Sequence, residues 1–206
     1  MEGERTKQGR LRTIMNRLVN RMTARKACAV TVVFIVLLWL IDYSPVGVAG
    51  LLQVTGGANI LDFESGYTVD YAYGMLEALG EAGRSFHLTK IMPLDIFFPV
   101  GLMIFLTSWM SLLLKRLTSD GSVLRLLPLI AVVNMLLDWS ENIGITLMLL
   151  NYPERLETVC RITSTVSAAK MVCVKCAGII LLLLIICRLV RKICCLAKSG
   201  NVSHVE

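Results

Sequence analysis

The chain has 206 residues, of which 55% are hydrophobic and only 17% are charged, and its mean hydropathy is +0.68. A soluble domain of this size is usually more charged, and several apolar runs here exceed the roughly 18 residues that indicate a membrane helix. The net charge is +6, but the basic residues gather at the ends of the apolar runs, which is typical of membrane orientation. The composition therefore argues against a soluble protein and against a nucleic-acid partner, and predicts an integral protein of the lipid bilayer.

Residues 1–26 form a basic arm in which Lys and Arg far outnumber the acids. Its apolar residues recur at the i, i+3, i+4 spacing of one helix face, which predicts an amphipathic helix on the cytoplasmic leaflet. A second interpretation is an organelle-targeting peptide, since such peptides are basic and amphipathic, but Glu2 and Glu4 argue against it. The apolar positions are Leu11, Ile14, Met15, Leu18, Val19 and Met22.

The remaining chain predicts an all-α, four-helix transmembrane bundle over residues 27–192, followed by a cytoplasmic tail over residues 193–206. Lys and Arg concentrate in the arm, in the 115–125 turn and in the tail. The positive-inside rule then places both termini in the cytoplasm. The sequence does not identify the membrane, and a plasma membrane or endomembrane is favoured over an organelle. The predicted spans cover about 27–50, 91–114, 126–150 and 163–189.

The predicted extracytoplasmic loop over residues 51–90 is acidic and contains no cysteine. Thr68 can cap a short amphipathic helix that continues to about Leu79, and Gly80 and Gly83 are suited to end it. We expect this helix to lie on the outer membrane surface or over the mouth of the bundle.

The third span carries a stripe of polar side chains inside an otherwise apolar segment. Asn134, Asp138, Glu141 and Asn142 recur at i, i+4, i+7 and i+8, so they lie on one helix face. An ionisable side chain at the centre of a membrane helix costs roughly 2.5–3.5 kcal/mol. The stripe must therefore face other helices or a water-filled pocket.

A lysine of the fourth span is the expected partner of these acids. Lys170 and Lys175 are about 140° apart around a helix, so they cannot both face the stripe. Lys170 shares its face with other polar residues and is the preferred partner of Glu141 or Asp138, with Lys175 as the rival. Asp95 of the second span can join them. The predicted polar core is Asp95, Asn134, Asp138, Glu141, Asn142 and Lys170.

Two interpretations of this polar core stay open. It can be a buried network that fixes helix packing, or assembly with a membrane-protein partner or a second copy of the chain. It can instead be a pocket that binds a small polar ligand. A small transporter or proton-conducting protein is the next alternative. No catalytic residue, cofactor or metal ligand is predicted, and the protein is expected not to be an enzyme.

The cysteines suggest two further hypotheses. Cys173 and Cys176 form a C-x-x-C motif, as in the membrane thiol oxidoreductases of the vitamin K epoxide reductase type, but the loop lacks the second cysteine pair that such a relay needs. Cys194 and Cys195 follow basic residues at the cytoplasmic end and are candidates for lipidation by palmitate; free thiols are the alternative.

Several motifs together resemble a set of uncharacterised small four-span membrane proteins. They are the run from Tyr73 to Arg84 that ends in Leu-Gly-Glu-Ala-Gly-Arg, Leu94-Asp95 with Pro99, the Asp-x-x-Glu-Asn motif over 138–142, and Lys170. The resemblance covers roughly residues 66–185. The resemblance implies a four-span fold and suggests that these residues matter for it. It implies no activity.

Overall fold

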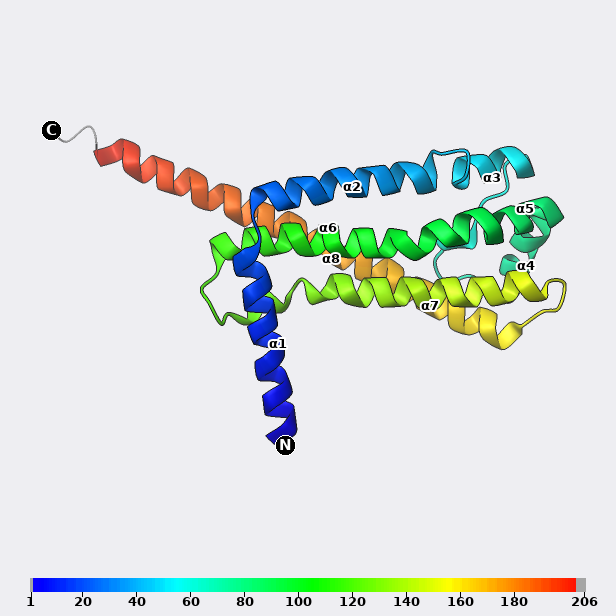
Figure 1. Ribbon diagram of the computed structural model, residues 1–206, viewed down its shortest axis with the longest axis horizontal. Coiled ribbons are helices and arrows are strands. Elements are labelled where there is room, and N and C mark those ends of the chain that lie inside the picture. Colours follow the sequence, from blue (N-terminus) through cyan, green and yellow to red (C-terminus); the bar gives the residue numbers. More distant parts are fainter. Residues whose placement is uncertain (1, 203–206) are drawn as a thin grey trace.

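The computed structural model describes residues 2–202, with side chains over residues 9–196. Within this part of the chain every regular element is helical. Four helical stretches are long and apolar enough to cross a membrane (Figure 1). They cover Ala24–Asp42, Gly80–Leu117, Val123–Asn151 and Glu157–Leu196. The prediction of an all-helical chain with four long apolar helices is confirmed.

The α-helices are numbered in chain order, with short 3₁₀ or π-helical turns between some of them. The turns are η1 (Leu61–Phe63), η2 (His87–Ile91) and η3 (Val123–Leu126). The α-helices are α1 (Glu2–Arg21), α2 (Ala24–Asp42), α3 (Val48–Thr55), α4 (Val69–Ala78), α5 (Gly80–Phe86), α6 (Met92–Leu117), α7 (Leu129–Asn151) and α8 (Glu157–Val202).

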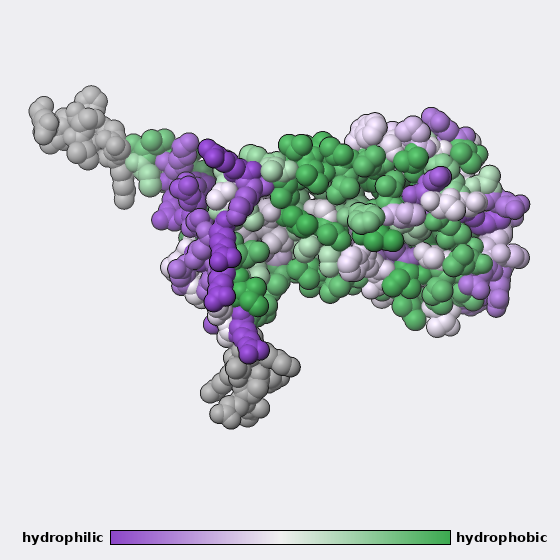
Figure 2. All heavy atoms as spheres, in the orientation of Figure 1, coloured by the Kyte–Doolittle hydropathy of each residue, from purple (hydrophilic) through white to green (hydrophobic). Residues whose placement is uncertain are grey.

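Helix α6 is the centre of the arrangement, because it packs against α2, α7 and α8, while α7 and α8 also pack along each other. Figure 2 shows hydrophobic residues over the middle of the visible face and hydrophilic residues at its two ends. Many large apolar side chains on the outer faces of α2 and α8 are exposed, among them Val32, Ile35, Trp39, Ile179 and Leu182. An apolar belt of this kind is the surface that a lipid bilayer would cover.

The first apolar segment is shorter than the expected span over 27–50. Helix α2 begins after Thr23, whose side chain accepts a hydrogen bond from the Lys26 N–H, and it ends at Asp42. The helix stops there because Pro45 has no N–H to donate and also disfavours helical geometry at Ser44. The chain then forms α3 as a separate short helix.

The loop over 51–90 contains the predicted short helix, but its end differs from expectation. The Thr68 side chain accepts from the Tyr71 N–H and starts α4. Gly80, with φ +64°, breaks the helix in the left-handed region that glycine adopts readily. The prediction that Gly83 also ends a helix is wrong: Gly83 lies inside α5, where an added Cβ would lie 2.5 Å from Thr55 Cγ2. Helices α5 and α6 are joined through η2, so the second apolar stretch begins at Gly80.

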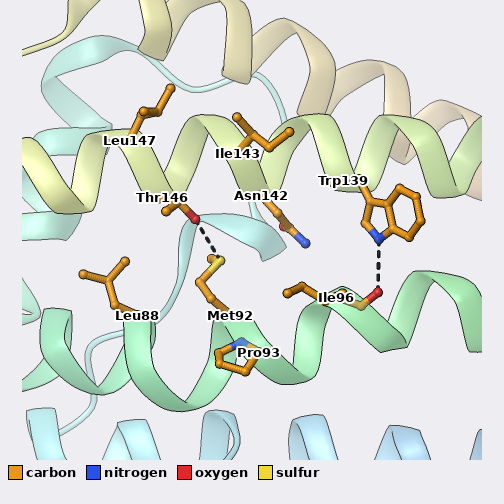
Figure 3. A pocket seen from close by; sticks show the side chains of 9 residues that line it. All are labelled: Leu88, Met92, Pro93, Ile96, Trp139, Asn142, Ile143, Thr146 and Leu147. Carbon is orange, nitrogen blue, oxygen red and sulfur yellow. Dashed lines mark hydrogen bonds between the residues drawn. The ribbon is translucent and has the colours of Figure 1, made fainter.

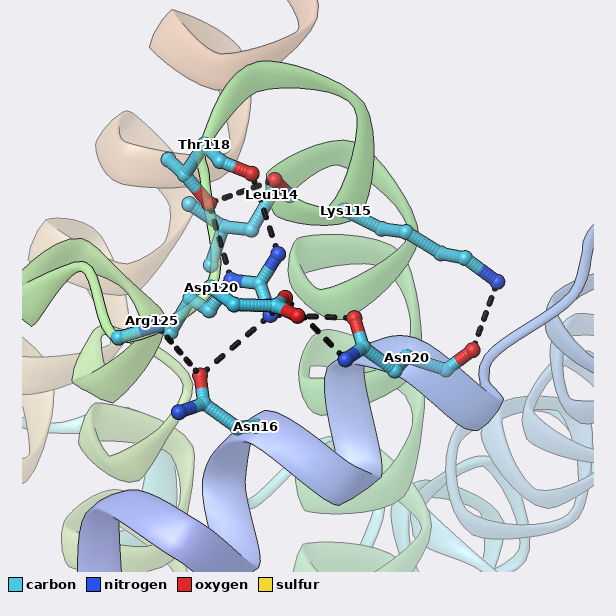
Figure 4. Close-up of polar contacts among 8 residues, drawn as sticks. Asn16, Asn20, Leu114, Lys115, Thr118, Asp120 and Arg125 are labelled. Atoms are coloured by element: carbon cyan, nitrogen blue, oxygen red, sulfur yellow. Dashed lines mark hydrogen bonds and ion pairs between the residues drawn. The ribbon is translucent and has the colours of Figure 1, made fainter.

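Helix α1 crosses the end of the long helices at which α6 ends and η3 begins, at a steep angle to α2 (Figure 1). Arg125 of η3 is buried and holds it in place (Figure 4). The Arg125 guanidinium donates to Asp120 Oδ1 at 2.5 Å, to Asn20 Oδ1 at 3.0 Å and to the Thr118 carbonyl at 3.1 Å. Lys115 Nζ adds a bond to the Asn20 carbonyl at 2.7 Å. The predicted basic helix, α1, is therefore held against α6 and η3 by hydrogen bonds.

The Arg125→Met substitution is expected to release α1 from η3. The substitution removes the donors that Asp120, Asn20 and Thr118 use, so amide hydrogens of residues 10–20 should exchange much faster than in the native chain. Arg116→Met, at an exposed residue nearby, is the control and should leave this exchange unchanged. Equal protection in both variants would show that the guanidinium does not hold α1.

The same contacts give the docking of α1 a pH dependence. Hydrogen bonds from Asn20, and then from Arg125, hold the pKa of Asp120 below its ordinary value. A group whose pKa is lowered by folding stabilises the folded state above its unfolded pKa and loses that effect as the pH falls through the lowered value. Exchange at α1 should therefore rise on acidification only below the usual range of an aspartate.

Candidate functional site

The structure brings two of the predicted polar residues into a buried ion pair. The carboxylate of Glu141 on α7 pairs with Lys170 Nζ on α8, and the Glu141 side chain is 0% exposed. Lys175, the rival partner, lies on the exposed side of α8. Helices α7 and α8 come into close contact at Gly144, about one turn along α7 from Glu141. Gly144 has no side chain, and Thr163 of α8 occupies the space that a Cβ would need. The small residue thus lets the acid of one helix reach the lysine of the other.

A cavity of about 210 Å³ lies beside this pair, between α2, α6, α7 and α8. Asp95, Asn134, Asp138 and Lys170, all four predicted, contribute to its wall together with Asp62. Asp42 lies at the wall contributed by α2, and the rest of the lining is apolar. Four of the six predicted core residues therefore line the cavity. The other two, Glu141 and Asn142, lie beside it.

Two polar residues of this region, Asp62 and His87, were absent from the predicted core. The Asp62 side chain is 9% exposed and that of His87 is 1% exposed, and His87 Nε2 lies 3.6 Å from Asp62 Oδ2. Both lie in the 51–90 segment, which was predicted as an extracytoplasmic loop. No periodic pattern marks Asp62, because it lies in η1, a 3₁₀ turn of three residues that is too short to show one.

The segment around Asp62 folds inward because the polar stripe of α8 binds its backbone. Ser164 Oγ donates to the Tyr67 carbonyl and Ser167 Oγ to the Glu64 carbonyl, both at 2.7 Å. Lys170 Nζ reaches the Asp62 carbonyl at 3.5 Å. The sequence contained this signal, since Ser167 and Lys170 share a helix face, but it did not show that the acceptors come from a loop.

Several buried polar atoms around the cavity have no hydrogen-bond partner within the described residues. They include both carboxylate oxygens of Asp62, Oδ1 of Asn134 and the Tyr67 hydroxyl. Burial, and then the charge of Glu141, raise the pKa of Tyr67 above its ordinary value, so this phenol keeps its proton and can donate. Buried polar atoms in proteins are usually paired. These atoms are therefore free to bind water or a ligand.

Asn142 has a structural task beside the cavity. Pro99 has no N–H, so the carbonyl of Asp95, four residues earlier, lacks its helical partner. Asn142 Nδ2 donates to that carbonyl at 3.2 Å, and Trp139 Nε1 donates to the next carbonyl, that of Ile96, at 3.1 Å. Figure 3 shows Asn142 and Trp139 on α7 facing the open stretch of α6, along an apolar groove of about 640 Å³.

The Asn142→Leu substitution should cost about 1 kcal/mol, because hydrogen bonds between membrane helices contribute roughly 0.6 kcal/mol on average and up to 1.7 kcal/mol. The cost should shrink in a Pro99→Ala background, where the restored N–H can serve the Asp95 carbonyl. A double-mutant cycle on unfolding in detergent measures this coupling. Equal costs in the two backgrounds would show that Asn142 does not replace the missing donor.

The structure places the cysteines away from any paired arrangement. All seven are free thiols, and Cys173 Sγ donates to the Ile130 carbonyl at 3.5 Å while Cys176 is exposed. Cys194 and Cys195 are exposed on α8, so their lipidation stays a prediction. Among the described residues, no three His, Cys, Asp or Glu side chains are placed to hold one metal ion.

No protein-family model, curated protein or solved structure matches this chain. The resemblance to small four-span membrane proteins stays a prediction.

Proposed function

We propose that the chain is a multi-pass integral membrane protein that binds a small polar ligand in the cavity beside Lys170. Four apolar helices of sufficient length and an apolar surface belt support its place in a bilayer. The basic helix α1, the turn after α6 and the C-terminal part of α8 lie toward one end of the molecule (Figure 1). By the positive-inside rule this is the cytoplasmic end, so both termini are cytoplasmic and the cavity lies toward the opposite leaflet.

The observation that carries the proposal is a cavity with several acidic side chains in a largely apolar wall, whose buried polar groups are only partly paired. Asp62, Asp95 and Asp138 line it, and both oxygens of Asp62 lack a partner among the described residues. A network that only fixes helix packing would satisfy its own polar groups. Here Glu141 pairs with Lys170 through one carboxylate oxygen, and its other oxygen, Oε1, also lacks a hydrogen-bond partner in the described part of the chain. Unpaired groups around an open volume favour a ligand site over the assembly interpretation.

Proton movement is the second candidate. His87 and Asp62 lie in contact distance at the outer end, and Asp95 and Asp138 line the cavity below them. Intramembrane acids and histidines in such a series can relay protons. Proton flux into liposomes that contain the purified chain, abolished by Asp138→Asn, would favour this candidate.

Native mass spectrometry of the full chain tests the ligand proposal. The native protein, extracted in mild detergent, should carry a small molecule of defined mass that the Asp95→Asn/Asp138→Asn double variant loses. The matched control is Glu77→Gln/Glu81→Gln, which removes two exposed carboxylates outside the cavity and should retain the molecule. A native protein free of any small molecule, or equal retention in the double variant, would contradict the proposal.

A further inference from the structure

The charge balance of the cavity indicates the kind of ligand. Four carboxylates line it, those of Asp42, Asp62, Asp95 and Asp138, and Lys170 is the single Lys or Arg in its wall. Lys170 is already paired with Glu141, which is fully buried. Several negative charges in a low-dielectric site must be neutralised, either by protons or by a compensating positive charge. A ligand with a cationic group supplies that charge, whereas an anionic ligand would add to the excess.

The chemistry of the wall favours an organic ammonium over a metal ion. The described residues offer no group of three His, Cys, Asp or Glu side chains that could coordinate one ion. A primary ammonium group instead has three N–H donors, which suits carboxylate and amide oxygens spread around a cavity. The two unpaired oxygens of Asp62, whose side chain is about nine-tenths buried, are such acceptors.

The shape of the cavity indicates the rest of the ligand. Along α6 its wall passes from Asp95 to Leu102, about 10 Å toward the cytoplasmic end at 1.5 Å per residue. Along α8 it passes from Lys170 to Val174 in the same direction. The charged side chains therefore lie toward the outer end, and the wall toward the middle of the proposed membrane is uncharged, with Asn134 as its one polar group. This is the order of charged and uncharged groups in a lipid-like amphiphile.

The sides of the cavity provide a route from the bilayer. Helices α2 and α8 both pack on α6 and both contribute to the cavity wall, through Ile41 and Val174 among others. Phe63 at the cavity is 50% exposed, and Asp42 is partly exposed. An amphiphile in the outer leaflet can therefore insert its head group between these two helices while its tail follows the apolar wall.

We propose that the ligand of this cavity is a single-chain membrane amphiphile with a protonated amine head, held by Asp62, Asp95 and Asp138 and admitted between α2 and α8. This inference rests on the proposed function and narrows it to one ligand class. The head lies beside the acids at the outer end, and the alkyl chain lies along Leu102 and Val174.

The test uses the full chain in phosphatidylcholine nanodiscs and four probes added at equal mole fraction: dodecylamine, dodecanol, dodecanoate and butylamine. The thermal unfolding midpoint is measured against probe concentration. Dodecylamine should raise the midpoint saturably and the other three should not. Asp95→Asn/Asp138→Asn should raise the half-saturating dodecylamine concentration at least tenfold, and Glu77→Gln/Glu81→Gln should leave it unchanged.

A third variant guards against acid substitutions that simply weaken folding. Leu102→Trp fills the apolar end and leaves all acids in place, so it should abolish the dodecylamine response. Stabilisation by butylamine equal to that by dodecylamine would overturn the amphiphile, and a preference for dodecanoate would overturn the cationic head. No response to any probe would overturn the inference; a ligand retained in native mass spectrometry would then still support the proposed function.

Discussion

Replacing Lys170 by methionine is expected to lower the free energy of unfolding by about 3–5 kcal/mol, the cost of breaking a buried ion pair from one side. Glu141 is fully buried and Lys170 is its ion-pair partner, so the substitution leaves a carboxylate without its countercharge. The neighbouring ionisable side chain in the cavity wall, Asp138, is itself an acid and cannot replace the lost positive charge. Reversible unfolding in mixed micelles, at increasing fractions of a denaturing detergent, measures the loss.

Two further variants separate the ion pair from general effects of the substitution. Lys175→Met makes the same change at an exposed position of the same helix and should alter stability by less than about 0.5 kcal/mol. Glu141→Met with Lys170→Met should recover most of the loss, because replacing both partners by apolar groups is often neutral. A Lys170→Met variant as stable as Lys175→Met would show that the pair does not stabilise the helix contact.

The Gly144→Val substitution is expected to cost about 3 kcal/mol, at the upper end of the usual cost of overpacking. A Cβ at this position would overlap Thr163 on α8, so either the helices separate or the side chains are strained. Separation would also pull Glu141 away from Lys170, since both lie within two turns of this contact. The same detergent titration measures the effect.

Gly178→Val is the matched control, because a Cβ at Gly178 meets nothing within 4 Å. It should leave the protein as stable or slightly more so, since valine has a higher helix propensity than glycine. Thr163→Ala should in turn relieve part of the Gly144→Val defect, because it removes Oγ1 and Cγ2 but keeps the Cβ 2.9 Å from the added atom. Equal effects at the two glycines would contradict a close contact between α7 and α8 at Gly144.

Helix periodicity predicted the parts of the site that lie on long helices. The stripe on α7 and the choice of Lys170 over Lys175 followed from angles around a helix, and the structure places Glu141 and Lys170 in contact. Asp62 and His87 could not be found in this way. Asp62 lies in the three-residue turn η1, which is too short for a periodic pattern. The hydrogen bond from Ser167 to the Glu64 carbonyl likewise joins residues far apart in the sequence and cannot be predicted from a local pattern.

Helix ends were predicted less well than helix faces, and the two glycines of α5 show why. Gly80 has a positive φ and ends α4, whereas Gly83 serves a close contact with Thr55. Both roles require glycine, so the sequence alone does not distinguish a helix end from a packing contact. The first span was likewise overestimated, because residues 48–55 are apolar but follow the Pro45 break.

The most direct test is a solid-state NMR distance measurement on the full chain in lipid bilayers, with ¹⁵N at lysine Nζ and ¹³C at glutamate Cδ. Lys170 and Glu141 form the only Lys–Glu ion pair among the residues whose side chains the structure describes. The proposed arrangement predicts one strong dipolar coupling that is slow to exchange with bulk water and absent in Lys170→Met. No coupling, with every lysine ammonium group in contact with bulk water, would contradict a charged pair inside the membrane domain.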